Sequence, residues 1–306
     1  MKVLVVARCK EGRYAPFITE QVKALQELGV ECCFSPVNKS GIWGYLLHLG
    51  GLKRAISAFR PDLIHAHYGL SGLFANLQRQ VPVVTTYHGS DINDRKVRPF
   101  SRLSIHLSAY NIFVSRKILD IISPKNKSAL IPCGINLEDY PEMDKDKARL
   151  QMHLSATGKY VLFSGAFDNS VKNAPLAKEA VSHLESVKLI ELKGYSRAEI
   201  STLMYAADAL LMTSITEGSP QVIKEALACG CPIVSVDVGD VKELTDDVSG
   251  CFVVERDSVS IANALRNALE IGGRTEGRHI IEEKGLSNDV IAERIMDIYQ
   301  RVKEKR

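Results

Sequence analysis

The sequence predicts an α/β fold of two Rossmann-like, doubly wound domains that face each other across a cleft. Its 306 residues suffice for two domains of ordinary size. In both halves, short β-branched runs alternate with helix-type apolar spacing, which is typical of parallel sheets covered by helices on both faces. An irregular stretch runs from Pro132 to about Ser155. We therefore expect one domain at residues 1–150 and a second at residues 151–306. The last helix of the second domain could also pack on the first domain.

In the first half, the run Val3–Ala7 is typical of a buried strand. The segment Pro16–Leu28 has helical spacing that stops at Gly29, a helix C-terminal signal. Small residues predict a further helix at Gly69–Gln80. The other strands of this half are expected at Glu31–Phe34, Leu63–Ala66, Val81–Tyr87, Asn111–Ser115 and Ser128–Ile131.

The second half repeats the same alternation of strand and helix patterns. Strands are expected at Tyr160–Ser164, Lys188–Leu192, Ala209–Thr213, Pro232–Val236 and Cys251–Val254. Helices are expected at Ala174–Leu184, Arg197–Ala206, Pro220–Ala228, Ser258–Leu269 and Asn288–Lys305. Because such sheets bind ligands outside the carboxyl ends of their strands, we expect the site in the cleft between the domains.

Composition narrows the class of protein. No apolar run reaches 18 residues and the apolar N-terminal run is too short for a signal peptide, so we expect a cytoplasmic protein. The seven cysteines include no Cys-x-x-Cys pair and are expected to be free thiols. Residues 1–150 hold 21 Lys and Arg against 13 Asp and Glu, a balance of +8 that favours anionic lipids or phosphorylated substrates. No nucleic-acid-binding motif occurs, so no nucleic-acid partner is expected.

The strongest local signal lies between Thr213 and Ser235, where the pattern indicates strand, loop, helix, turn and strand. Ser219 suits the N-cap of the helix and Pro220 its first position. Gly218 lets the backbone approach a ligand closely, and the free N–H groups of a helix N-terminus bind a diphosphate well.

Two glutamates belong to the same segment. Glu217 lies in the loop and Glu225 in the helix, on a face that can point to the same cleft. A carboxylate accepts two hydrogen bonds, which suits a ribose diol. The alternative interpretation is a capped amphipathic helix with two solvated glutamates.

Glu217 and Glu225 resemble the Glu-x7-Glu signature of the retaining glycosyltransferases called group 1 or family 4, which have the GT-B architecture. Further similar segments are Asp237–Glu243, His65–Gly72, Thr86–Asp91, Ile131–Leu137 and Phe163–Asn173. Two more segments, Ala15–Ile18 and Lys39–Leu46, resemble those of one branch of this family. That branch is bacterial and builds capsular, O-antigen and related surface polysaccharides.

The resemblance implies a role for each matching residue. Glu225 would bind the ribose of the donor, and Glu217 would lie beside the donor sugar. His88 would contact that sugar near the reaction centre. Lys172, beyond the glycine loop at Gly165, would neutralise the departing diphosphate. The resemblance also implies retention of anomeric configuration, no metal and no other cofactor.

The sequence departs from the family at two places. An arginine commonly follows the glycine that corresponds to Gly165, but Ala166 and Phe167 follow it here. Lys193 or Arg197 is our hypothesis for a substitute cation. The segment before Arg197 is also short, so the nucleobase pocket is altered, and Tyr195 is our candidate for packing on the base.

Other motifs carry weaker predictions. His65-x-His67 could form a metal pair, but no carboxylate-rich set accompanies it, so internal packing is favoured. Asp144-Lys-Asp146 is interpreted as a solvated run. The basic run Arg95–Arg102 is either a solvated face or, beside Trp43, Tyr45 and Leu46, a contact with the inner leaflet of a membrane.

The resemblance therefore implies transfer of a hexose-type sugar from a UDP- or GDP-sugar to a lipid-linked or growing saccharide in bacterial surface polysaccharide biosynthesis. Two alternatives stay open. One is a sugar-nucleotide epimerase of the same architecture, which would convert its donor without an acceptor. The other is a non-catalytic subunit that binds nucleotide sugars.

Overall fold

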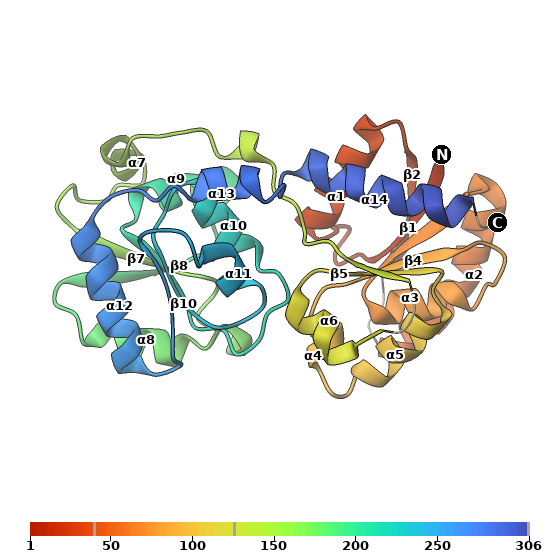
Figure 1. Cartoon of the computed structure of the whole chain (residues 1–306), viewed down its shortest axis with the longest axis horizontal. Helices are drawn as coiled ribbons and strands as arrows, with labels where there is room; N and C mark the ends of the chain where they lie inside the picture. Colours follow the sequence, from red (N-terminus) through yellow and green to blue (C-terminus); the bar gives the residue numbers. More distant parts are fainter. Residues whose placement is uncertain (39–40, 125–126, 305–306) are drawn as a thin grey trace. The chain divides into compact units, whose positions relative to one another are not determined.

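The computed structural model describes residues 1–38, 41–124 and 127–304, without the side chains of residues 41–43, 46 and 47. Its internal contacts divide the chain into two compact units (Figure 1). Unit 1 comprises Met1–Gly134 and Asn288–Arg306, and unit 2 comprises Ile135–Ser287. Each unit contains one parallel sheet, which confirms the predicted fold class of two doubly wound α/β domains.

The division after Gly134 lies earlier than the expected boundary at residue 150. The cause is helix α7 (Lys145–Gln151), which packs on helix α9 (Arg197–Ala206) of unit 2. The Asp144 carboxylate accepts hydrogen bonds from the first backbone N–H groups of α7 and so caps it. Part of the stretch predicted to be irregular is therefore a capped helix.

The sheet of unit 1 has the strand order β2-β1-β3-β4-β5-β6, with every pair parallel. Its strands are β1 (Lys2–Arg8), β2 (Glu31–Val37), β3 (Leu63–His67), β4 (Val83–Tyr87), β5 (Tyr110–Phe113) and β6 (Ser128–Leu130). Its helices are α1 (Pro16–Glu27), α2 (Gly41–Phe59), α3 (Gly69–Asn76), α4 (Ser90–Asn93), α5 (Arg98–Leu107), α6 (Arg116–Ile122) and α14 (Asn288–Lys303).

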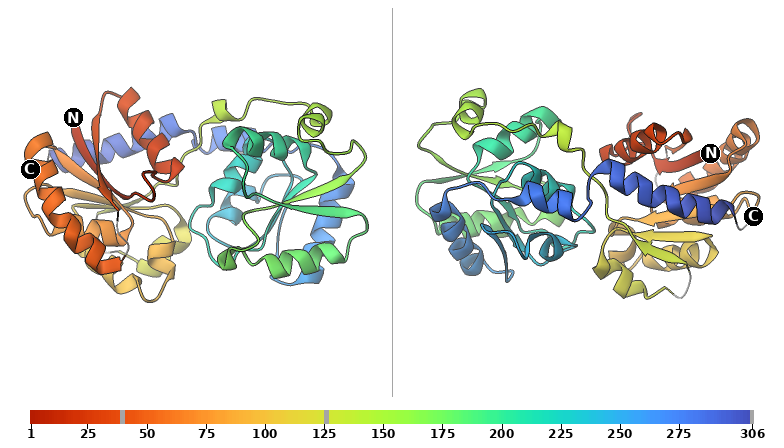
Figure 2. Two further views of the ribbon diagram at one scale, coloured as in Figure 1. Left: turned by 180° about the vertical axis from the view of Figure 1, so that it is seen from behind. Right: turned by 45° about the horizontal axis from the view of Figure 1, so that its top comes forward.

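Alternation along β1 explains why helices cover both faces of this sheet. Val3, Val5 and Ala7 pack in one core with residues of α1 and α14. Leu4 and Val6 point to the opposite face and pack with residues of α2 and α3. The last helix α14 packs beside α1, so the final segment of the chain completes the core of unit 1 (Figures 1 and 2).

The sheet of unit 2 has the order β11-β10-β9-β7-β8 and is also parallel. Its strands are β7 (Lys159–Phe163), β8 (Val187–Glu191), β9 (Ala209–Met212), β10 (Ile233–Val236) and β11 (Cys251–Val254). Besides α7 and α9, its helices are α8 (Ala174–Ser182), α10 (Gln221–Ala228), α11 (Val241–Thr245), α12 (Ser258–Ile271) and α13 (Gly277–Glu283). The strand order reverses beside β7, so its carboxyl end and that of β9 flank the switch point at which such sheets bind ligands.

The elements that flank residues 77–82 are shorter than predicted. Helix α3 ends at Asn76 instead of Gln80, and β4 begins at Val83 instead of Val81. The Gln78 side chain holds the intervening loop, because its Oε1 accepts the backbone N–H groups of Gln80 and Val81 and its Nε2 donates to the Val81 carbonyl.

Candidate functional site

Lys172 and Glu217 meet at the carboxyl edge of the unit 2 sheet. Lys172 ends the short 3-10 helix Ser170–Lys172 beyond β7, and Glu217 lies in the loop beyond β9. The Lys172 Nζ donates to Glu217 Oε1 at 2.8 Å, and both side chains are less than one-fifth exposed. The structure therefore joins two predicted site residues that are far apart in the sequence.

Gly165 makes room for this lysine. A Cβ atom built on Gly165 would lie 2.9 Å from Cγ of Lys172 and 3.1 Å from its Cε. The aliphatic part of Lys172 thus runs directly over the glycine on its way to Glu217. Gly165, which was predicted as part of the donor-binding segment, thus leaves space for the path of the lysine side chain.

Hydrogen bonds connect the two loops that carry this ion pair. Thr213 Oγ1 donates to the carbonyl groups of Lys172 and Asn173 at 2.9 and 3.0 Å. The Ile215 N–H donates to the Val171 carbonyl at 2.8 Å. Arg256, which the sequence analysis did not single out, donates to the carbonyl groups of the loop that precedes Glu217. The carboxyl edge between β7 and β9 is therefore preorganised.

The N-terminus of α10 differs from the expectation by one residue and by the role of Ser219. Pro220 is the N-cap and the helix begins at Gln221, so the prediction of Ser219 as N-cap and Pro220 as first helical residue was wrong. Ser219 Oγ instead donates to Asp240 Oδ2 at 2.5 Å and accepts from Lys224 Nζ at 2.7 Å. This arrangement leaves the hydroxyl turned toward internal charges instead of the helix backbone.

Lys224 and Asp240 are two buried, opposite charges that the Ser219 hydroxyl bridges. Lys224 is fully buried and Asp240 is 4% exposed. Burial raises the pKa of Asp240, and the nearby Lys224 ammonium offsets part of that increase. A Cβ atom on Gly239 would lie 2.5 Å from the Gly218 carbonyl oxygen, so the two turns are in close contact. Sequence reasoning missed Lys224, although a lysine among the apolar positions Ile223, Ala226 and Leu227 was a visible signal.

Glu225 lies one residue further along α10 and is half-buried. Its carboxylate hydrogen-bonds Tyr140, and its charge acts with burial to raise the pKa of that tyrosine. Arg197 Nε donates to the Tyr140 hydroxyl at 3.3 Å, and the Arg197 guanidinium lies 3.5 Å from Asp139. Glu225 therefore belongs to a polar cluster with Tyr140 and Arg197.

The other residues proposed for donor binding lie near the end of β8. Tyr195 is 37% exposed and follows Gly194, whose φ of 87° turns the chain. Lys193, one of the two candidate substitute cations, donates to Asp168 at 2.5 Å on the surface. The other candidate, Arg197, contacts Tyr140 and Asp139 as described above.

In unit 1, His88 directly follows β4 and belongs to a line of stacked imidazoles. Its Nε2 lies 3.1 Å from Nδ1 of His67, and the Cys133 Sγ lies 3.7 Å from its Nδ1. The rings of Phe17 and Tyr68 also pack against His88. These contacts fix the orientation of the ring at the carboxyl end of the strand.

Asp91 shapes the turn that holds His88. Its carboxylate accepts the backbone N–H groups of His88, Gly89 and Gly69 at 2.9 to 3.1 Å. Burial raises the pKa of Asp91 to about 6, although these hydrogen bonds act in the opposite direction. The sequence analysis included Asp91 in the family-like segment Thr86–Asp91 but assigned it no role.

The His65-x-His67 pair is packed internally, as favoured from the sequence. Nδ1 of His65 lies 2.5 Å from the Tyr299 hydroxyl, and its Nε2 lies 2.7 Å from Thr86 Oγ1, so both ring nitrogens have protein partners. Burial lowers the pKa of both histidines. Among the described residues, no group of three or more His, Cys, Asp or Glu side chains is placed to hold a metal ion.

A pocket of about 820 Å³ opens at the carboxyl ends of β1 and β3 in unit 1. Tyr68 and Asp91, which contact His88, form part of its wall. Other lining residues include the cations Arg8, Lys10 and Arg13 and the aromatic residues Tyr14 and Tyr45. Its position at the switch point between β1 and β3 is that of a ligand site in this type of sheet.

The segment considered for membrane contact is only partly described. Arg98 donates to the Ile92 and Asn93 carbonyl groups, whereas Phe100 and Leu103 of α5 are exposed. Tyr45 is buried, and the side chains of Trp43 and Leu46 lie outside those that the structure describes. Within the described ranges, no helix combines the length and apolar character needed to span a bilayer.

Two family models match the chain. The model of glycosyltransferase family 4 matches residues 4–139, and the model of glycosyl transferases group 1 matches residues 170–270. The D-inositol 3-phosphate glycosyltransferase of Mycobacterium marinum is 25% identical over 74% of this chain and 60% of its own length. The amylovoran biosynthesis glycosyltransferase of Erwinia amylovora is 25% identical over 68% of this chain and 61% of its own length. The chain thus spans about 60% of the length of these relatives.

Solved structures support the same fold. Sucrose-phosphate synthase from Thermosynechococcus elongatus matches with a TM-score of 0.87 and 17% identity over 100% of both chains. The Anabaena protein HepE, solved in complex with UDP and glucose, matches with a TM-score of 0.73 and 18% identity over 98% of this chain and 99% of its own. At these identities the likeness concerns the fold.

Proposed function

Because the chain belongs to the glycosyltransferases of group 1 and family 4, we propose that it transfers a sugar from a UDP- or GDP-sugar with retention of anomeric configuration. The observation that carries the proposal is the Lys172–Glu217 pair beside the N-terminus of α10. The UDP bound by the Anabaena relative supports the UDP alternative.

In this proposal, unit 2 holds the donor. Lys172 and the backbone N–H groups of Gly218, Ser219 and the start of α10 bind the diphosphate and stabilise its negative charge as it leaves. Gly165 provides the space for the Lys172 side chain. Glu225 holds the ribose, and Tyr195 packs on the base.

Glu217 and His88 orient the donor sugar in the same proposal, as the resemblance implies. When diphosphate binds, its charge competes with Glu217 for the Lys172 ammonium. The released Glu217 carboxylate is then able to accept hydrogen bonds from sugar hydroxyls. The reaction as proposed uses no metal and no further cofactor.

Unit 1 is proposed to bind the acceptor, a lipid-linked or growing saccharide of a bacterial surface polysaccharide. The support is the pocket beside Tyr68 and Asp91, because tyrosine rings offer flat apolar surfaces to sugar rings and its cations suit a phosphate linkage. The amylovoran relative adds support for polysaccharide as the product class. We further propose a cytoplasmic location at the inner face of a membrane, where such an acceptor would be found.

The first experiment measures binding of UDP- and GDP-sugars by calorimetry in the wild type and in Lys172→Ala and Glu225→Ala. We expect each substitution to weaken binding at least about tenfold, because each removes a charged hydrogen bond to the donor. Lys188→Ala is the matched control, since Lys188 is an exposed lysine of β8. Wild-type affinity in both site variants would contradict the proposal that Lys172 and Glu225 bind the donor.

Product analysis then separates the transferase from its alternatives. With donor alone, an epimerase would convert the sugar nucleotide, whereas a transferase would only hydrolyse it slowly. A non-catalytic subunit would bind the donor without either reaction. Transfer to an added saccharide acceptor, with the α or β configuration of the donor retained, is the expected result.

A further inference from the structure

A second pocket of unit 1 lies at the sheet edge opposite His88. A pocket of about 990 Å³ is lined by the first residues of β4, β5 and β6, which are Val83, Tyr110 and Ser128. His88 follows the other end of β4. The pocket is therefore separate from the donor and acceptor sites proposed above, and an inference about it does not depend on them.

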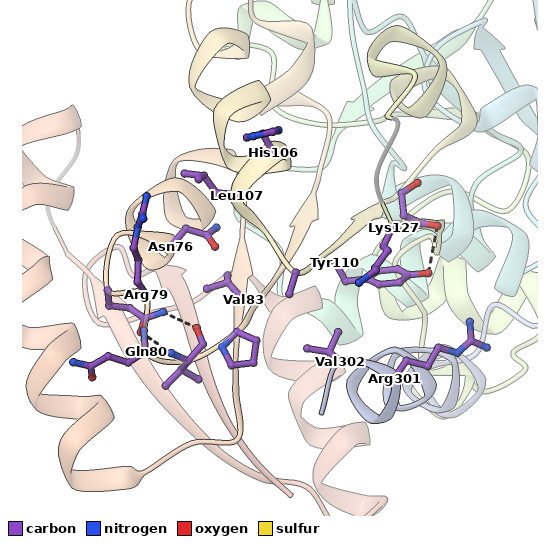
Figure 3. Close-up of a pocket in the computed structure, with 15 residues that line it drawn as sticks. Asn76, Arg79, Gln80, Val83, His106, Leu107, Tyr110, Lys127, Arg301 and Val302 are labelled. Carbon is purple, nitrogen blue, oxygen red and sulfur yellow. Dashed lines mark hydrogen bonds between the residues drawn. The ribbon is translucent and has the colours of Figure 1, made fainter. Parts of the chain in front are cut away.

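Cations surround this pocket without any carboxylate among its described lining residues. Arg79, Lys127 and Arg301 contribute exposed charged side chains, and His106 contributes an exposed imidazole. Lys127 and Arg301 lie toward the Tyr110 end of the pocket, whereas Arg79 lies toward the Asn76 end (Figure 3). The positive charge is thus distributed around the opening.

Three charged groups of this pocket have no partner among the residues that the structure describes. Within those residues, no ion pair or hydrogen bond involves the guanidinium groups of Arg79 and Arg301 or the ammonium group of Lys127. By contrast, Lys303 of the same helix α14 lies 3.1 Å from Asp62. The three charges are therefore available to an external anion.

The backbone holds one of the cations in an unfavourable conformation. Arg79 has a φ of 55°, in the left-handed region that residues other than glycine rarely adopt. The bonds of Gln78 to Gln80 and Val81 fix the loop around it. The loop therefore fixes the backbone position from which the exposed Arg79 side chain extends.

The buried part of the pocket lining is partly apolar. Val81, Val83 and Val302 are buried there beside the amide of Gln78, and the Tyr110 hydroxyl donates to the Ser128 carbonyl at 3.4 Å. Exposed cations above these buried valines suit a ligand that joins an anionic head to an apolar or ring-shaped body. Arginine matches phosphate particularly well, because its planar guanidinium binds two phosphate oxygens at once.

We propose that this pocket binds a phosphate ester, held by Arg79, Lys127 and Arg301. The ester has two sources with the same chemistry: a free phosphorylated compound and the headgroup of an anionic phospholipid. The site lies on unit 1 alone and would remain functional in a variant that binds no nucleotide sugar.

The test follows the ring resonances of His106 by NMR in the full chain, assigned with His106→Gln, during titration with phenyl phosphate. A parallel experiment measures co-sedimentation with phosphatidylcholine vesicles with and without phosphatidylglycerol. The test variant combines Arg79→Gln, Lys127→Gln and Arg301→Gln. The matched control combines Lys23→Gln, Lys53→Gln and Arg54→Gln, which removes the same charge from exposed positions of α1 and α2.

We expect a saturable shift of His106 in the wild type and the control, and an affinity at least about tenfold weaker in the test variant, because three charge contacts are lost. A shift with phenyl phosphate identifies a free phosphate ester as a sufficient ligand. Co-sedimentation only with phosphatidylglycerol, lost in the test variant, identifies a lipid headgroup. The proposal is overturned if neither probe binds, or if the test variant and the control bind both probes equally.

Discussion

The Nζ atom of Lys172 lies 2.8 Å from Oε1 of Glu217, so the cation proposed to receive the donor diphosphate is already neutralised by the carboxylate proposed to orient the sugar. Binding of a diphosphate must therefore compete with an internal ion pair. Because of this competition, a change at Glu217 should affect the affinity for the donor and the rate of transfer differently.

Glu217→Gln should lower the rate of sugar transfer by roughly 100-fold, because an oriented charge beside the reacting sugar is lost. The affinity for UDP should stay equal or increase, because Lys172 no longer has a carboxylate partner. Calorimetry with UDP and a transfer assay measure the two effects separately. A loss of UDP affinity equal to the loss of rate would contradict the proposed competition.

Gly165→Ala should weaken UDP binding by about tenfold with little change in stability. The new Cβ would lie 2.9 Å from Cγ of Lys172, so the flexible lysine must move away from its position over the glycine. Gly50→Ala is the control, since a Cβ there has no atom within 4 Å. Calorimetry and thermal unfolding of both variants provide the comparison. If Gly165→Ala bound UDP as the wild type does, the path of Lys172 would not matter for the donor.

Lys224→Met should destabilise the protein by about 3 kcal/mol, because it leaves the buried Asp240 carboxylate without its cation. The double variant Lys224→Met with Asp240→Asn should regain much of this loss, since no unpaired charge remains. Urea unfolding of the two single variants and the double variant yields the coupling free energy. Additive effects of the two substitutions would show that the pair does not act as a unit.

The sequence predicted those features that follow from periodicity and from local motifs. Apolar runs such as Val3–Ala7 located β1, and the segment around Glu217 located the loop before α10. Side-chain networks escaped prediction because they depend on tertiary contacts: Ser219 turns away from the helix it was expected to cap, toward Lys224 and Asp240.

The boundary between the two units was difficult to predict from the sequence for a related reason. The stretch around Asp144 looks like a solvated, charged linker, and its helix is stabilised by a local cap and by contacts that the sequence does not reveal. Arg149 of α7 donates to the Ala206 carbonyl at 3.0 Å and lies 3.0 Å from Asp208. These partners are more than 50 positions away, so no local pattern indicates to which unit α7 belongs.

Asp91 makes the stability of the protein depend on pH. The pKa of Asp91 is raised from 3.8 to about 6 by burial, so the folded state holds this proton up to a higher pH than the unfolded state does. Between about pH 4 and pH 6 the folded state therefore binds more protons at this position, and the contribution of Asp91 to stability falls as pH rises. A difference of about two pKa units corresponds to roughly 3 kcal/mol over this window.

Asp91→Asn should flatten this part of the stability profile. The variant should also be less stable at every pH, because an amide oxygen cannot accept all three backbone N–H groups of His88, Gly89 and Gly69. Urea unfolding of the wild type and the variant at several pH values between 4 and 6.5 measures both slopes. Asp120→Asn, on the exposed surface of α6, is the matched control and should keep the wild-type slope. Parallel profiles for the wild type and Asp91→Asn would mean that Asp91 is ionised across the whole window, and that its three backbone hydrogen bonds outweigh burial.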